Sequence, residues 1–177
     1  MKKTIINISL IVTIFIIYSL QSNFFSWFNI SGIMPNIFII FILFVGLFSN
    51  KTMGMIYGIS SGIILDLLLG EIIGLNAICL GLIGFLAGIF DKNFSKDNRM
   101  IMIFMVGITT FLFEILKYIL KYIIVDVNIE VIYFIEILAI EILFNIIITI
   151  IIYPIIQKAG YYIEKIYKGN KILTRYF

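Results

Sequence analysis

Residues 54–77 read GMIYGISSGIILDLLLGEIIGLNA, and this stretch decides the fold. Glycines and one acid recur at every fourth position, namely Gly54, Gly58, Gly62, Asp66 and Gly70. Positions four apart lie on one ridge of an α-helix, which drifts slowly around the helix axis. Because glycine has no side chain, such a ridge lets a second helix approach closely. The stretch therefore predicts a closely packed apolar helix with Asp66 on its contact ridge.

The residues that follow predict the helix beside it. Small residues now alternate spacings of three and four, at Gly74, Ala77, Gly81, Gly84 and Gly88. That rhythm is typical of a left-handed helix-packing seam. Only a short turn from Gly70 to Gly74 joins the two helices. They are therefore predicted to be antiparallel neighbours.

These glycines have two interpretations. The first, which we favour, is that they only pack helices against each other. The second is that one face also takes a third helix, from this chain or from a partner protein. On the second interpretation, leucine at Gly58 or Gly62 is expected to disrupt packing more than leucine at Gly46.

The composition places this hairpin in a membrane. The chain has 177 residues, of which 62% are hydrophobic, and its mean hydropathy is +1.15. Soluble domains are about 45–50% apolar, so the excess predicts an all-α integral membrane protein. A span needs about 20 mostly apolar residues to cross a hydrocarbon core of about 30 Å. Six spans are predicted, at residues 4–20, 33–48, 52–69, 73–90, 100–125 and 131–153.

The span ends follow from local signals. The first apolar run lacks a cleavage pattern, so it is expected to be a retained span. Pro35 is expected in the first turn of the second span, where its missing N–H does little harm. Pro154 is expected to end the sixth span. The chain is thus divided into a bundle of residues 1–154 and a tail of residues 155–177.

The charges predict the orientation. Basic residues occur before the first span, in alternate loops and after the last span, at Lys2, Lys3, Lys51, Lys92, Lys96, Arg99, Lys158, Lys165, Lys168, Lys171 and Arg175. The loops on the opposite side carry only Glu71, Asp126 and Glu130. Because cytoplasmic loops are enriched in Lys and Arg, both termini are predicted to be cytoplasmic.

Two segments are expected at the membrane surface. The tail repeats apolar residues at Ile156, Ala159, Ile163 and Ile166 between lysines, which predicts a basic amphipathic helix on anionic lipid. The outer loop 21–32 holds Phe24, Phe25, Trp27 and Phe28. We favour an aromatic belt at the headgroups for this loop, and the alternative is a docking patch for a partner.

Charged residues inside the spans form a candidate polar cluster in the outer half of the membrane, made of Asp66, Glu114, Lys117, Glu136 and Glu141. Lys117 could pair with Glu114 or with Glu136, whereas Lys121 is expected to reach the interface. Charges that face lipid are expensive, so the cluster should face inward. It is interpreted either as ion pairs that fix helix register or as a polar pocket that opens outward to bind a solute or a partner's polar residue.

Several kinds of chemistry are excluded. The chain has no histidine, and its single cysteine, Cys79, is expected to be a small buried side chain. This rules out an internal disulfide and a catalytic system based on histidine, and it argues against a Cys/His metal site. No catalytic residue, metal or cofactor is expected, and no nucleic-acid partner. The oligomeric state stays open.

The ordered motif resembles the rod shape-determining protein MreD family. The resemblance covers roughly residues 32–90, and its residues are Met34, Pro35, Asn36, Gly54, Gly58, Gly62, Ile64, Leu65, Asp66, Leu67, Gly70, Gly74 and Ala77. Many members have Asp where this chain has Asn36. Pro35, Asn36, Asp66 and Gly70 match positions of the family's motif, but the resemblance assigns no role to them.

The resemblance implies a non-enzymatic scaffold subunit of the bacterial cell-elongation machinery, or elongasome, in the inner membrane. It implies binding to the bitopic protein MreC, and through it to MreB and the elongation-specific synthases of peptidoglycan. It also implies a six-helix fold similar to the substrate-binding subunits of energy-coupling-factor vitamin transporters. A solute-binding transporter subunit is the alternative function.

Overall fold

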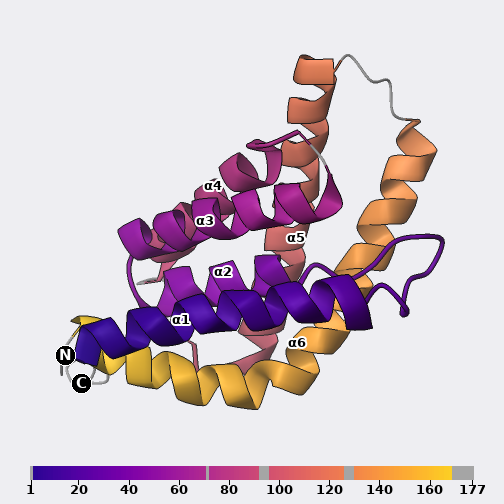
Figure 1. Cartoon of the computed structure of the whole chain (residues 1–177). Coiled ribbons are helices and arrows are strands. Elements are labelled where there is room, and N and C mark those ends of the chain that lie inside the picture. Colours follow the sequence, from indigo (N-terminus) through magenta and orange to yellow (C-terminus); the bar gives the residue numbers. More distant parts are fainter. Residues whose placement is uncertain (1, 71, 92–95, 126–129, 169–177) are drawn as a thin grey trace.

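The computed structural model describes residues 2–70, 72–91, 96–125 and 130–168, and these residues form an all-helical protein. A short π-helical turn, η1 (Leu20–Phe24), extends the first helix (Figure 1). The helices of this part of the chain are α1 (Lys2–Ser19), α2 (Ile37–Phe48), α3 (Lys51–Leu69), α4 (Leu75–Phe90), α5 (Arg99–Val125) and α6 (Val131–Lys168).

Four helices of the described residues are long and apolar enough to cross a membrane, as in a multi-pass membrane protein. These are α1 with its η1 extension, α3, α5 and α6. The helices α2 and α4 are also apolar but have only 12 and 16 residues. At about 1.5 Å per residue, α2 spans roughly 18 Å, less than a hydrocarbon core of about 30 Å. Six crossings therefore stay a prediction.

The second helix begins later than expected. Ile30 and Ile33 exchange backbone hydrogen bonds of 3.0 and 2.9 Å, and the intervening Ser31 and Gly32 have positive φ angles. The backbone then stays non-helical until Ile37. Placing Pro35 in the first helical turn was therefore wrong, because Pro35 precedes the helix.

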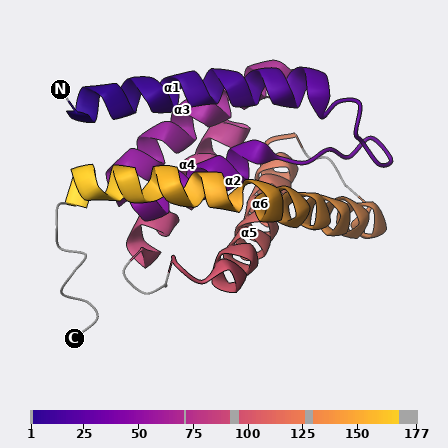
Figure 2. The same cartoon turned by 90° about the horizontal axis from the view of Figure 1, so that it is seen from below.

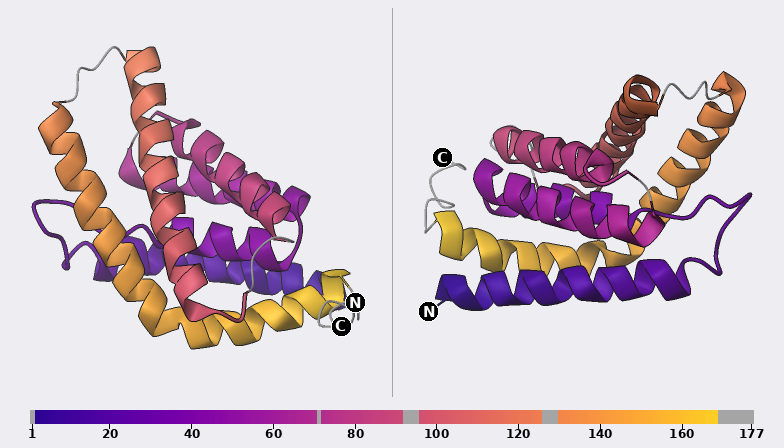
Figure 3. Two further views of the ribbon diagram at one scale, coloured as in Figure 1. Left: turned by 180° about the vertical axis from the view of Figure 1, so that it is seen from behind. Right: turned by 45° about the horizontal axis from the view of Figure 1, so that its top comes forward.

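The last helix does not end at Pro154, as the sequence had suggested. Pro154 lies inside α6, which continues to Lys168. The helix changes direction along its length, so its second half runs back along the bundle (Figures 1 and 3). Proline can bend a helix without ending it when neighbouring structure supports both halves.

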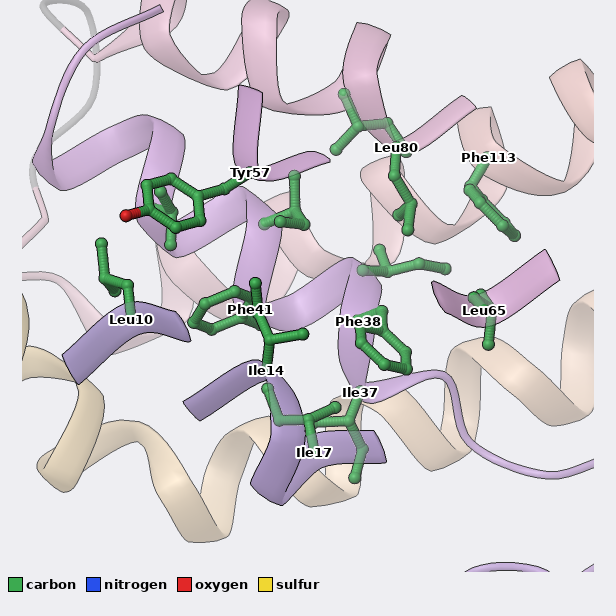
Figure 4. Packing of buried hydrophobic residues seen from close by; sticks show 14 of the residues in the cluster. Leu10, Ile14, Ile17, Ile37, Phe38, Phe41, Tyr57, Leu65, Leu80 and Phe113 are labelled. Carbon is green, nitrogen blue, oxygen red and sulfur yellow. The ribbon is translucent and has the colours of Figure 1, made fainter. Parts of the chain in front are cut away.

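Helix α2 is the centre of the molecule, and all twelve of its residues are buried. Helix α2 contacts α1, α3, α4, α5 and α6. Figure 2, seen from below, shows α1 and the second half of α6 running roughly parallel to each other. Helix α5 and the first half of α6 lean away at a steep angle (Figure 3). Buried side chains of α1, α2, α3, α4 and α5 form one core cluster. Figure 4 shows part of this cluster, with labels on Leu10, Ile14, Ile17, Ile37, Phe38, Phe41, Tyr57, Leu65, Leu80 and Phe113.

The glycine ridge of α3 faces α4, as the hairpin predicted. A Cβ atom at Gly54 would collide with the backbone carbonyl of Gly84, and one at Gly58 with the carbonyl of Leu80. A Cβ atom at Gly62 would collide with the Cα of Ala77. The two backbones are therefore in direct contact, and the glycines are used within the hairpin.

The packing seam also includes Gly46 of α2, and this changes the expected effect of leucine at that position. A Cβ atom at Gly46 would lie 2.6 Å from the Cβ of Ala87 and 2.6 Å from the carbonyl oxygen of Gly84. Helix α2 thus approaches α4 as closely as a glycine allows. Leucine at Gly46 is therefore expected to be as disruptive as leucine at Gly58, not less so.

Alanine at Gly58 is predicted to destabilise the protein, and alanine at Gly107 is the matched control. At Gly58 the added methyl group meets backbone that cannot move aside, so we expect a loss of about 1–3 kcal/mol or more. At Gly107 the nearest atom is the flexible Ile146 Cδ1, 3.9 Å away. Unfolding of both variants in detergent tests this prediction, and equal stabilities would refute the backbone contact.

Candidate functional site

Asp66 holds the turn between α3 and α4. One carboxylate oxygen, Oδ2, accepts a hydrogen bond of 2.7 Å from the backbone N–H of Gly74. The other, Oδ1, accepts bonds of 2.9 and 2.7 Å from the backbone and side-chain amides of Asn76. Gly70 and Gly74 have φ angles of +63° and +109°, which favour glycine and form the turn. Asp66 itself is fully buried.

These bonds explain a carboxylate inside an apolar hairpin. The first N–H groups of a helix have no partner within the helix, and negative charge is stabilised beside them. Asp66 reaches from the end of α3 to cap the start of α4. It performs the role of an N-cap residue from eight to ten positions away. Amide donors thus stabilise the carboxylate of Asp66.

A cavity of about 250 Å³ lies where the non-helical segment before α2, the end of α3, the second half of α5 and the start of α6 meet. Its lining also includes one residue of η1. The lining residues are Gln21, Gly32, Ile33, Met34, Asn36, Leu65, Leu69, Glu114, Lys117, Tyr118, Lys121, Tyr133, Phe134, Ile137 and Glu141.

Three buried polar residues form what we call the floor of the cavity: Asn36, Glu114 and Glu141. The Glu141 carboxyl interacts with the Glu114 carboxyl and with the Asn36 amide. Two buried acceptor atoms, Glu141 Oε1 and Asn36 Oδ1, have no hydrogen-bond partner among the described residues. Buried acceptors of this kind are rare in folded proteins. The floor is therefore equipped to receive hydrogen-bond donors.

The remaining charged and aromatic residues of the lining, which we call the rim, are two lysines and three aromatic residues. Lys117 and Lys121 are partly exposed, in contrast to the buried carboxyl groups. The rings of Tyr118 and Phe134 lie 4.8 Å apart, and Tyr133 lines the cavity beside them. The polar residues that line the cavity are therefore buried acids and an amide at the floor, and partly exposed amines at the rim.

Side-chain amides hold the non-helical backbone at the floor. The Asn36 N–H donates to Asn145 Oδ1 at 2.9 Å, and Asn145 Nδ2 donates to Thr110 Oγ1 at 3.0 Å. Gln21 Nε2 donates to the Pro35 carbonyl at 2.6 Å. These residues position Asn36 across four segments of the chain. Gln21 was missed from the sequence, where it looked like one polar residue in an aromatic loop.

The structure divides the cluster expected from the sequence. It brings Glu114, Lys117 and Glu141 together around one cavity. It places Asp66 in the hairpin turn, outside the lining, and it leaves Glu136 exposed on α6. Cys79 is buried, as its apolar surroundings suggested.

A second polar cluster docks the last turns of α6. Lys96 forms salt bridges with Asp91 and, at 2.6 Å, with Glu164. Lys168 contacts Asp91 at 2.7 Å and Glu164 at 3.4 Å, and it donates to the Leu47 carbonyl at 3.0 Å. The charges of two acids and two lysines thus neutralise each other where α2, α4 and α6 end.

The apolar face of the tail covers the protein in this structure. Ile163 and Ile166 pack against the core cluster around α2, and Ile156 packs against a neighbouring one. A Cβ atom at Gly160 would lie 2.6 Å from the ring of Phe48. The amphipathic pattern was expected to serve lipid, and residues 155–168 use most of it for internal packing.

The comparisons with known proteins identify a family. The family model described as rod shape-determining protein MreD matches residues 2–162 of the 177-residue chain. The match includes the hairpin and the whole cavity. No curated protein and no solved structure matches the chain significantly.

Asp66→Asn is predicted to be intermediate in stability between the wild type and Asp66→Leu. An asparagine keeps one acceptor oxygen but turns an N–H₂ group toward one of the present donors, which should lose about 1–3 kcal/mol. Leucine removes both acceptors. Thermal unfolding in detergent ranks the three proteins, and a wild-type stability for Asp66→Leu would show that Asp66 does not hold the turn.

Lys96→Met is predicted to release the last turns of α6. The substitution leaves Asp91 and Glu164 buried with one cation fewer, and an uncompensated buried charge is strongly destabilising. Backbone hydrogen exchange over residues 155–168 should then accelerate. The control is Lys158→Met, because Lys158 is an exposed lysine of the same helix. Equal exchange in the two variants would contradict a docking role for the cluster.

Proposed function

The chain belongs to the rod shape-determining protein MreD family, and on that premise we propose that it is a non-enzymatic scaffold of the bacterial elongasome. In this role it binds the bitopic protein MreC in the inner membrane. Through MreC it acts with MreB and with the elongation-specific cell-wall synthases, and so supports peptidoglycan synthesis and rod shape. The observation that carries the proposal is the family match over residues 2–162.

The proposed topology has six crossings with both termini in the cytoplasm. In support, basic residues gather at one end of the molecule. Lys3 lies over the ring of Tyr167 at 5.6 Å, and Lys168 contacts the last turns of α2 and α4. The beginning of α1 and the end of α6 therefore share one end, as an even number of crossings requires. Residues 155–177 are then the cytoplasmic tail of the bundle.

The proposed MreC contact is the outward face of the hairpin. The glycines of α3 and α4 are occupied by each other, so a partner helix would meet larger side chains. Ile56, Ile63 and Leu67 lie on one exposed stripe of α3, at spacings of seven and four residues. The glycine seam makes this stripe rigid, and a rigid apolar stripe suits a single transmembrane helix.

Alanine at Ile56, Ile63 and Leu67 is predicted to reduce co-purification with the MreC of the same bacterium by at least about tenfold, as loss of a few well-packed anchors does. The control replaces three exposed apolar residues of α1, Ile8, Val12 and Phe15, by alanine. If the control variant in α1 also loses MreC binding, the contact is not specific to the hairpin. If the wild-type chain neither co-purifies with MreC nor changes cell shape on depletion, the proposal itself is wrong.

The cavity favours a second candidate, a solute-binding subunit of a vitamin-type transporter. Its buried floor and basic rim are arranged as in a small-molecule site. This candidate rests on the cavity, since no solved structure matches the chain. Uptake that persists when Glu141 is replaced by glutamine, together with native mass spectra free of any small ligand, would eliminate it.

A further inference from the structure

The backbone carbonyl of Ile150 in α6 lacks its usual hydrogen-bond donor. In an α-helix this oxygen accepts from the N–H four residues later, and here that residue is Pro154, which has no N–H. The guanidinium of Arg99 donates to the Ile150 oxygen instead, with an Nη2···O distance of 2.7 Å. Arg99 is the first residue of α5, so another helix supplies the donor that Pro154 lacks. A hydrogen bond from a charged donor is also stronger than the amide bond that it replaces.

The segment that contains Arg99 holds α6 just before the proline. The Tyr153 hydroxyl donates to the backbone carbonyl of Lys96 at 3.0 Å and to that of Asp97 at 3.3 Å. The guanidinium of Arg99 lies 6.0 Å from the centre of the Tyr153 ring, within the range of cation–π attraction. Because Tyr153 is buried, these contacts fix the position of α6 on this side of the bend.

The same segment also holds α6 on the other side of the bend. The Tyr161 hydroxyl donates to the Asp97 carboxylate, and Lys96 forms its salt bridge of 2.6 Å with Glu164. We call residues 96–99 the latch. The latch thus contacts α6 both before and after the bend, so it determines the angle between the two halves of the helix.

The second half of α6, residues 155–168, covers the end of α2, and we call it the strap. A Cβ atom at Gly160 would touch the ring of Phe48, and the rings of Phe48 and Tyr161 lie 5.5 Å apart. Tyr161 also packs against the buried cluster of which Phe48 is a member. Proline removes a hydrogen bond from a helix and crowds the carbonyl of the preceding turn, so a helix bends most easily there. Rotation of the strap about Pro154 would uncover the end of α2.

We propose that the strap is hinged at Pro154 and opens as a unit, and that Arg99 holds it closed by supplying the donor that the Ile150 carbonyl lacks. The bond from Arg99 joins the latch to the hinge itself, because its acceptor is the oxygen that the proline leaves without a donor. Opening exposes Phe48, so the latch controls access to the apolar end of α2. The strap and its latch belong to one chain, and this device does not depend on the scaffold function.

Double electron–electron resonance across the bend tests the hinge in the full-length protein in detergent. Spin labels are placed at Leu143 and Lys165, two exposed positions on either side of the bend, after the buried Cys79 is replaced by serine. A straight helix would separate these positions by about 33 Å, and a bent helix separates them by less. The wild type is expected to show the shorter distance. Arg99→Met is expected to raise the population at the longer distance at least about tenfold, as loss of a hydrogen bond to a charged group does.

Lys158→Met is the matched control, because it removes an exposed positive charge from the strap itself. It should leave the distance distribution unchanged. A wild-type distribution in Arg99→Met would overturn the proposal, and so would an equal shift in Lys158→Met. If Arg99→Met does not fold, Tyr161→Phe takes its place, since it removes one hydroxyl from the latch contacts. It should raise the longer-distance population about threefold, and a wild-type distribution in this variant would then overturn the proposal.

A second pair of variants separates the missing donor from a general attraction between charges. Pro154→Ala restores an N–H that can bond to the Ile150 oxygen. In this background Arg99→Met is expected to change the longer-distance population by less than about twofold relative to Pro154→Ala alone. The same effect of Arg99→Met in both backgrounds would contradict the role of Arg99 as the replacement donor.

Discussion

The direct contact between the backbones of α3 and α4 is the constraint on which the rest of the structure depends. In a membrane, lipid is as apolar as the helices, so helices associate through close packing and through polar contacts. Close packing is possible because α3 has glycines at Gly54, Gly58 and Gly62. The polar contacts come from Asp66 at the turn. The hairpin can then pack as one rigid unit on α2, which is buried along its whole length.

The cavity depends on that hairpin. Leu65 and Leu69, at the end of α3, form part of its wall, and Asp66 lies between them in the chain. The opposite wall comes from α5 and α6, which lean away from the bundle (Figure 3). Asn36 completes the floor because amide side chains support a backbone that is not helical there. A position that must hold an open backbone in a membrane needs such partners.

The sequence predicted the hairpin well because its signals are local. Glycine spacing and the short turn fixed two antiparallel helices whose ends agree with the structure to within two residues. The two prolines were harder, since their effect depends on neighbours. Pro35 precedes a helix because Gln21 and Asn145 hold the open backbone around it, and Pro154 stays inside α6 because the helix is packed on both sides of it.

The site was only partly predictable for a similar reason. The expected depth in the membrane suggested that Glu114, Lys117 and Glu141 could meet, and the three residues line one cavity in the structure. Depth alone, however, does not give the direction of a side chain around its helix. Asp66 and Glu136 were expected at the same depth, but Asp66 bonds to the hairpin turn and Glu136 is exposed. The cluster around Lys96 joins residues 68 positions apart, so no local pattern could reveal it.

A double-mutant cycle between Asp66 and Asn76 tests the central claim most directly. Asp66→Leu, Asn76→Ala and the double variant are compared with the wild type by their free energies of unfolding. If the carboxylate closes the hairpin on Asn76, the two substitutions couple by about 1–3 kcal/mol. Additive effects, within about 0.3–0.5 kcal/mol, would contradict the account.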